Sequence, residues 1–318
     1  MCSSDLIELL ARYCRRAEFA LLVGLAHRDL GDLAAAETVL NLPELLASRD
    51  PELHYTRGTV YHEQNRFEEV MTCYSTVLEL DPGHVGASYS LGVASFERGS
   101  VEEAVTYFDR TLSLMPGHLS ALTSRARALH RLGRFAAAAN DYDRAVAAGN
   151  VSIGLRLEQS ASYAQLGRLD LSAAACLAGL ELEPDNTAAL HQLADIRSKQ
   201  GNPRETARIL RRILALEPSN QDAQIDLACV LIELGDADGA LQLARSQVQL
   251  TPLHAGAHLA LGGALASIGE THQAQASLLD ALDLDETLPE AWLHLSRSRR
   301  FGADDDNLIQ RAEKVAAQ

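Results

Sequence analysis

The chain has 318 residues, of which 47% are hydrophobic and only 5% aromatic, and its formal net charge is −15. A negatively charged chain repels the phosphates of nucleic acids and anionic lipid headgroups, so we expect neither nucleic acid nor a membrane as partner. No stretch is long and apolar enough to cross a bilayer. Met1 to Glu18 lack a secretory-signal pattern, and the five cysteines form no CxxC pair. We therefore expect a cytoplasmic protein without structural zinc.

The first predicted element is an N-terminal capping helix, in which Asp5 and Glu8 have the spacing of a capping box. A 34-residue repeat follows it. Its marker prolines are Pro82, Pro116, Pro184, Pro218 and Pro252, with Asn150 in the intermediate slot where a proline is missing. Half a repeat earlier stands a residue that tolerates the left-handed helix cap: Gly31, Asn65, Gly99, Gly133, Gly167, Gly201, Gly235 and Gly269. Each unit is therefore predicted to be a helix, a turn, a second helix and a second turn.

Within each unit, small and large residues recur at fixed slots. The eighth slot is small in most units, as Gly24, Gly58, Gly92, Ala126, Ala194, Ala228 and Gly262. The twenty-fourth slot is large in several, as Leu40, Tyr74, Phe108, Tyr142 and Leu210. A small residue on one helix lets a large one on its partner approach closely, so we expect the two helices of a unit to pack tightly.

This pattern resembles the tetratricopeptide repeat, in which leucine and glycine mark the first helix, alanine and an aromatic residue the second, and proline the close. The resemblance implies an all-α fold, a right-handed superhelical α-solenoid of tandem helical hairpins. We place a capping helix at 1–16 and a partial repeat with a capping helix at 289–318. The eight full units are expected at 17–50, 51–84, 85–118, 119–152, 153–186, 187–220, 221–254 and 255–288.

Two units depart from the pattern. Pro43 falls inside the expected second helix of the first unit, so we expect that helix to kink or stop early. In the fifth unit Gln159 and Cys176 replace the usual leucine and aromatic residue, which predicts weaker local packing.

Four common catalytic and cofactor-binding motifs are missing from the sequence. It contains no phosphate loop, GxSxG elbow, HExxH zinc helix or GxGxxG fingerprint, so we expect no enzymatic activity and no cofactor. His254 and His258 share a helical face but lack an evident third ligand, so we expect no metal site. His84, His118 and His254 occupy one loop slot and are interpreted as solvated turn residues. Cys73, Cys176 and Trp292 fall at packing positions and are interpreted as core.

The resemblance also predicts where a partner binds. In this family the first helices line a concave groove that accepts an extended peptide or a helix. Tyrosine and arginine are favoured at binding hot spots. The inward slots of the first helices give the candidate peptide-binding residues Tyr55, Thr59, His62, Tyr89, Val93, Phe96, Arg127, His130, Arg131, His191 and Asp195.

Charge is unevenly distributed along the repeats. The fourth unit has five arginines against two aspartates, a balance of +3, and the sixth unit has the same balance. Residues 221–288 contain ten acidic residues and one arginine, a balance of −9. An acidic partner is therefore expected to prefer the middle of the chain and a basic partner its end, although either patch would also serve solubility.

Two known ligand modes of the family do not fit. Chaperone-binding members hold a peptide carboxylate with lysine at the fifth slot, where this chain has no lysine, so a chaperone C-terminal tail is not expected. The asparagine ladder of O-linked sugar transferases is also missing, since the sixth slots include Leu22, Ser90, Ser124 and Gln192.

Three functions remain open from the sequence. The first is a non-catalytic scaffold that binds a protein or peptide segment in the groove. The second is the substrate-presenting repeat half of a larger enzyme whose catalytic domain lies outside this chain. A short resemblance to bacterial repeat-linked sulfotransferases supports it, through Trp292, Leu295, Phe301, Asp304 to Asp306, Leu308 and Ile309. The third is a bacterial assembly or secretion factor.

Overall fold

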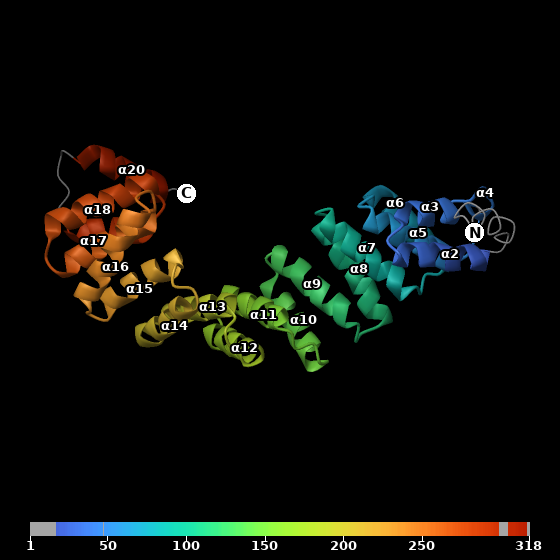
Figure 1. The fold of residues 1–318 in the computed structure, drawn as a ribbon, viewed down its shortest axis with the longest axis horizontal. Helices are drawn as coiled ribbons and strands as arrows, with labels where there is room; N and C mark the ends of the chain where they lie inside the picture. The colour runs from blue at the N-terminus through green and yellow to red at the C-terminus, as the bar shows by residue number, and fades with distance from the viewer. Residues whose placement is uncertain (1–16, 47, 299–304, 317–318) are drawn as a thin grey trace. The chain divides into compact units, whose positions relative to one another are not determined.

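The computed structural model describes residues 17–46, 48–298 and 305–316. The regular secondary structure of these residues is entirely helical (Figure 1). The expected capping helix at 1–16 lies outside them. The chain divides into two compact units, an N-terminal unit (residues 1–151) and a C-terminal unit (residues 152–318).

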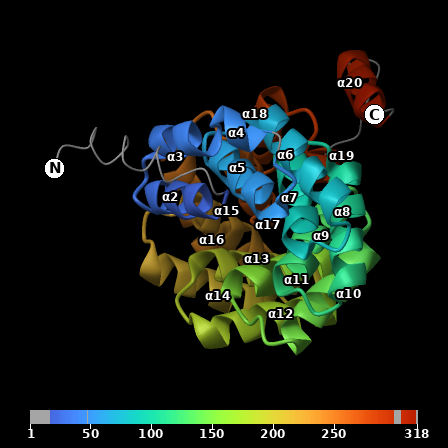
Figure 2. The ribbon, with the colours of Figure 1, turned by 90° about the vertical axis from the view of Figure 1, so that its right-hand side faces the viewer.

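The N-terminal unit consists of consecutive helical hairpins. Its helices are α2 (Ala17–Asp29), α3 (Leu33–Leu40), α4 (Pro43–Leu46), α5 (Pro51–Glu63), α6 (Phe67–Leu80), α7 (Val85–Glu97), α8 (Val101–Leu114), α9 (Leu119–Arg131) and α10 (Phe135–Ala147). The two helices of a pair, such as α7 and α8, lie side by side in both views (Figures 1 and 2).

The C-terminal unit repeats the same arrangement. Its helices are α11 (Ile153–Gln165), α12 (Leu169–Leu182), α13 (Thr187–Lys199), α14 (Pro203–Leu216), α15 (Gln221–Glu233), α16 (Ala237–Leu250), α17 (Ala255–Ser267), α18 (Thr271–Leu284), α19 (Pro289–Ser298) and α20 (Asp306–Ala316). The expected all-α fold of tandem helical hairpins is confirmed.

The turn within each hairpin is set by a left-handed residue. Gly99, Gly133 and Gly167 have φ of 87°, 72° and 68°, and Asn65 takes the same role with φ of 58°. The amide N–H of the residue after each of them donates a hydrogen bond to a carbonyl of the preceding helix, as Ser100 does to Ser95 at 2.8 Å. These bonds satisfy carbonyls that the helix end leaves without a partner.

Close packing inside each hairpin follows the small-to-large pattern. A Cβ built on Gly58 would lie 2.5 Å from a ring carbon of Tyr74, and one on Gly92 equally close to Phe108. Tyr74 and Phe108 are fully buried. The predicted contact between the eighth and twenty-fourth slots is therefore confirmed in these hairpins.

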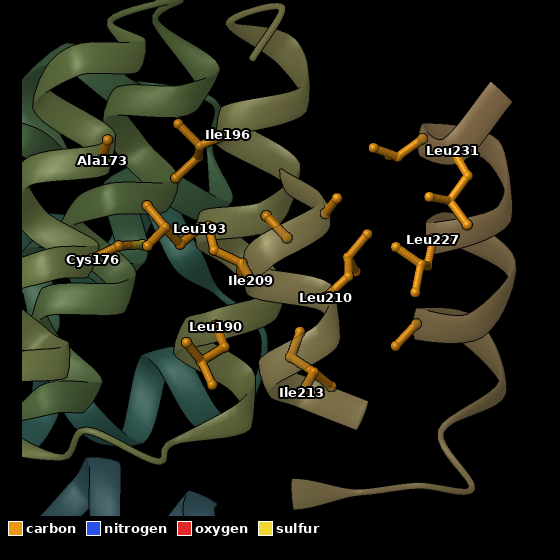
Figure 3. Close-up of a cluster of buried hydrophobic side chains, with 14 of the residues drawn as sticks. Ala173, Cys176, Leu190, Leu193, Ile196, Ile209, Leu210, Ile213, Leu227 and Leu231 are labelled. Carbon is orange, nitrogen blue, oxygen red and sulfur yellow. The ribbon is translucent and has the colours of Figure 1, made fainter. Parts of the chain in front are cut away.

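A large buried cluster lies in the C-terminal unit. Figure 3 shows side chains of α13, α14 and α15 meeting there, with Leu210 and Ile213 of α14 between Leu193 and Leu227. Each helix of this cluster is covered by its neighbours in sequence, as expected when repeats stack along one direction.

Pro43 ends the second helix of the first hairpin early, as predicted. The helix α3 stops at Leu40, and Pro43 begins the short helix α4. Arg57 of α5 compensates for the lost turn, because its Nε and Nη2 donate to the carbonyl oxygen of Leu40 at 2.8 and 2.5 Å. Only 5% of Arg57 is exposed, and burial lowers the pKa of its guanidinium.

The fifth hairpin, α11 with α12, carries a polar cluster at the positions where the other hairpins have a small residue against a large one. The hydroxyl of Ser160 lies 2.9 Å from that of Ser172 and 3.1 Å from Sγ of Cys176. All three side chains are fully buried. Hydrogen bonds here take the place of aromatic packing. The weaker packing expected for this hairpin stays a prediction.

Candidate functional site

Two tyrosines connect successive first helices of the N-terminal unit. The hydroxyl of Tyr55 on α5 lies 3.4 Å from that of Ser90 on α7, and Tyr89 on α7 repeats this contact with Ser124 on α9. Both tyrosines are half-buried, since their rings also pack against the large residue of their own hairpin, Tyr74 or Phe108. These two candidate residues therefore hold neighbouring hairpins together as well as present a phenol edge.

A second row of contacts runs beside the tyrosines. His62 Nε2 lies 2.7 Å from Oε2 of Glu97, and the guanidinium carbon of Arg131 lies 5.6 Å from the ring centroid of Phe96. In both contacts the partner residue is 35 positions further along the chain. The same spacing joins each tyrosine to its serine, so equivalent faces of α5, α7 and α9 are aligned.

The remaining candidates of this unit lie on the same faces. Thr59 is half-buried and accepts a hydrogen bond from Arg28 at 3.4 Å. Val93 is half-buried, and the ring of His130 packs edge-on against Phe135 at 5.0 Å. Arg127 and Arg131 are exposed. We use the name α5–α9 surface for Tyr55, Thr59, His62, Tyr89, Val93, Phe96, Arg127, His130 and Arg131.

His191 and Asp195 belong to the C-terminal unit and line a different feature. Nε2 of His191 lies 3.1 Å from Nδ2 of Asn220, and Asp195 pairs with Lys199 at 2.8 Å. Both residues border a cavity of about 170 Å³ formed by α13, α14 and α15. Sequence reasoning did not find the α15 residues Asp226 and Glu233, which complete the acidic part of this lining.

The histidines of the loop slot have a structural role that the sequence interpretation missed. Nδ1 of His84 accepts the amide N–H of Ala87 at 2.9 Å, and Nδ1 of His118 accepts that of Ala121 at 3.1 Å. His254 does the same for Ala257 at 3.3 Å. These side chains are helix N-caps rather than merely solvated turn residues, because they satisfy an amide that the first helical turn leaves without a partner.

Ring nitrogens of residues at the fourth slot form hydrogen bonds with backbone carbonyl oxygens that come earlier in the chain. Ring nitrogens of His54 and His258 lie 2.8 and 2.9 Å from the carbonyl oxygens of Ser48 and Pro252. The indole N–H of Trp292 donates to Glu286 O at 2.8 Å. In each case the carbonyl precedes the ring by six residues. Trp292 is half-buried beside the core of α18 and α19.

The described residues offer little for chemistry. None of the His, Cys, Asp and Glu residues among them form a group of three or more suited to a metal ion. Cys73 and Cys176 are buried, and burial raises the pKa of both thiols, that of Cys73 to about 11. In the part of the chain that the structure describes, no helix is both long and apolar enough to span a bilayer.

The C-terminal segment forms a helix and partly falls outside the described residues. The polar helix expected from Leu308 to Ala317 is present as α20, and its Arg311 donates to Glu286, Asp283 and the carbonyl of Leu282. Phe301 and Asp304, which carried part of the sulfotransferase resemblance, lie outside the described residues.

Comparisons with known families agree with this geometry. One family model described as a tetratricopeptide repeat matches residues 197–247, and a second with the same description matches residues 55–118 and 104–153. The chain is a tetratricopeptide-repeat protein. No catalytic family matches it, and proteins built from this repeat commonly bind other proteins.

Solved structures share the fold of this tetratricopeptide-repeat chain at low sequence identity. A repeat protein from Parabacteroides merdae is 16% identical with a TM-score of 0.53, over 89% of this chain and 98% of the other. MamA from Desulfovibrio magneticus is 19% identical with a TM-score of 0.50, over 54% of this chain and 96% of its own. The Cut9–Hcn1 hetero-tetramer of APC/C matches at 17% identity with a TM-score of 0.50, over 86% of this chain and 60% of the other. No curated protein sequence matches the chain.

Proposed function

We propose that the chain is a non-catalytic scaffold that binds an acidic peptide segment of a partner protein on the α5–α9 surface. The alignment of three consecutive first helices carries this proposal. Because the tyrosine–serine contact between neighbouring first helices recurs after 34 residues, tyrosine, phenylalanine and arginine side chains from α5, α7 and α9 are aligned as one surface.

The residue types on this surface suit protein recognition. Half-buried tyrosines are already ordered by their contacts with serine and with the hairpin core, so binding would cost little further side-chain entropy. Arg131 is held above the ring of Phe96, which leaves its guanidinium at the surface next to an apolar face. With exposed Arg127 on the same helix, it favours carboxylates over cations.

Peptide mixtures with a fixed centre test this proposal. Fluorescein-labelled peptides with central Glu-Glu, otherwise random and uncharged, would be compared by fluorescence anisotropy with the same mixture carrying Gln-Gln. We expect the Glu-Glu mixture to bind at least about tenfold more tightly, and Arg127→Glu with Arg131→Glu to abolish that preference.

A matched control removes the effect of net charge. Arg204 and Arg208 are exposed on α14 in the C-terminal unit, so Arg204→Glu with Arg208→Glu changes the total charge equally. This control should retain the preference for Glu-Glu. Equal binding of the two mixtures, or a preference that survives Arg127→Glu with Arg131→Glu, would sink the proposal.

A further inference from the structure

The cavity of about 170 Å³ in the C-terminal unit combines an apolar lining with acidic residues. Ala194, Leu210 and Val230 contribute buried apolar atoms, and each is at most 5% exposed. Asp195, Asp226 and Glu233 line the same cavity but remain exposed to solvent. His191, Ser198 and Thr206 add polar groups to the lining, and the carboxylates stand where the cavity meets water. We call it the acidic cavity.

Its size fits the end of one side chain. Sites for drug-sized molecules usually have volumes of about 300–1,000 Å³, which is larger than this cavity. The space corresponds to roughly six water molecules at about 30 Å³ each. Lysine and arginine lay their methylene stems along apolar surface while their charged heads stay near polar groups. A partly apolar lining with carboxylates at the opening matches that division.

Two of the three acidic residues of the cavity, Asp226 and Glu233, have no salt-bridge partner among the described residues. Neither carboxylate forms a side-chain hydrogen bond with those residues, whereas Asp195 pairs with Lys199 at 2.8 Å. Asp226 keeps contact with solvent, yet the surrounding protein removes enough hydration to raise the pKa of its carboxyl group. The nearby Asp222 raises this pKa further, although His191 acts to lower it.

The thiol in the lining does not alter this charge. Burial raises the pKa of Cys229 to about 12, and the negative charges of Asp226, Glu233 and Glu290 act in the same direction. Cys229 is therefore a neutral thiol at physiological pH and a weakly polar part of the wall. On α13 the ammonium group of Lys199 is paired with Asp195, whereas His191 lines the cavity itself.

We propose that the acidic cavity binds the side chain of a lysine or arginine presented by a segment of a partner protein. The site lies on α13, α14 and α15 and is therefore separate from the α5–α9 surface. Its charge preference is the opposite one. Charge complementarity is the reason for this choice of partner. A cation placed beside Asp226 and Glu233 would supply the salt-bridge partner that the described residues do not provide.

The test uses nonapeptide mixtures with one fixed residue. Fluorescein-labelled, acetylated and amidated peptides would carry lysine at the centre and random uncharged residues elsewhere, and the comparison mixture would carry glutamine there. Anisotropy titration of the whole chain at low salt should show at least about tenfold tighter binding of the lysine mixture. Asp226→Asn with Glu233→Gln should reduce the lysine mixture to the level of the glutamine mixture.

Two controls separate this site from others. Asp238→Asn with Glu270→Gln removes two exposed acidic charges elsewhere on the same unit and should leave the lysine preference intact. Arg127→Glu with Arg131→Glu should also leave it intact, so the acidic cavity and the α5–α9 surface can fail independently. Competition by n-butylamine as strong as that by unlabelled peptide would show that a free amine suffices and would overturn the peptide claim.

Either of two results would overturn the cavity itself. The first is equal binding of the lysine and glutamine mixtures to the wild-type chain. The second is a lysine preference that persists in Asp226→Asn with Glu233→Gln, provided that circular dichroism shows an unchanged helix content.

Discussion

The ring of Phe108 occupies the space in which Gly92 would carry a side chain: a Cβ there would lie 2.5 Å from Cε1 of the ring. The two residues come from α7 and α8 and fix the distance between these helices. Because Phe108 is fully buried, the ring has no free space into which it could retreat.

Gly92→Ala should therefore destabilise the chain, although alanine is the better helix former. Overpacking of a filled core typically costs about 1–3 kcal/mol. The matched control is Gly154→Ala, because a Cβ at Gly154 on α11 would meet nothing within 4 Å. That control should be neutral or stabilising by up to about 1 kcal/mol. Urea unfolding followed by circular dichroism measures both, and a stabilising Gly92→Ala would contradict the packing argument.

Arg57→Ala should cost more stability than removal of an arginine whose hydrogen bond is exposed. The substitution leaves the carbonyl of Leu40 without its donors and opens a cavity beside α3, with an expected loss of about 1–3 kcal/mol from the buried acceptor alone. Arg110 also donates to a carbonyl, that of Pro82 at 2.8 Å, but this hydrogen bond is exposed and Arg110 is only half-buried. Arg110→Ala should cost less than about 1 kcal/mol by the same unfolding measurement. Equal losses would show that Arg57 does not support the shortened helix.

Replacement of a capping histidine should follow the preferences of helix N-caps. His118→Ala removes the acceptor for the amide of Ala121 and should cost about 0.5–2 kcal/mol. His118→Asn should preserve the cap, since Asn186 and Asn220 accept from Ala189 and Ala223 at the same slot in the C-terminal unit. Thermal unfolding of the two variants should therefore rank asparagine above alanine, and the reverse order would argue against the capping role.

The thiols of Cys73 and Cys229 should make the chain less stable as the pH becomes alkaline. Burial raises the pKa of Cys73 to about 11 and of Cys229 to about 12, whereas an unfolded thiol ionises near about 8.5. The unfolded chain therefore loses these protons first, and the stabilising contribution is complete below about pH 8.5 and declines as the pH rises toward about 11–12.

The measurement compares urea midpoints at about pH 8 and about pH 10 for the wild type and for Cys73→Ala with Cys229→Ala. The wild type should lose more of its midpoint over this range than the double variant, which still contains the other titrating groups. An identical loss in both proteins would remove the thiols as the cause.

Local preferences predicted the fold because each one had a single structural outcome. A glycine or asparagine every 34 residues ends a helix, and Gly58 and Gly92 leave the space that the rings of Tyr74 and Phe108 fill. The early end of α3 followed from Pro43 in the same way.

Side-chain roles that depend on the three-dimensional structure were harder to predict from the sequence. Histidine is not among the preferred N-cap residues, so the sequence pattern gave no reason to assign His84 or His118 that role. The candidate list contained His191 and Asp195 but neither Asp226 nor Glu233, because only the structure brings α13 and α15 to one cavity. Tyr55 and Tyr89 were expected to face a ligand. Their rings are half-buried between hairpins, and the position of a residue in the repeat does not by itself give the direction of its side chain.

The hydrogen bond from Trp292 to Glu286 has a practical consequence for optical experiments. The chain contains one tryptophan, and its indole is fixed near the last hairpin of the C-terminal unit. Its emission spectrum consequently reports the solvent exposure of that region, whereas far-ultraviolet signals average over every helix. Denaturation curves recorded by tryptophan emission and by far-ultraviolet circular dichroism would reveal whether the end of the repeat array unfolds together with the rest or before it.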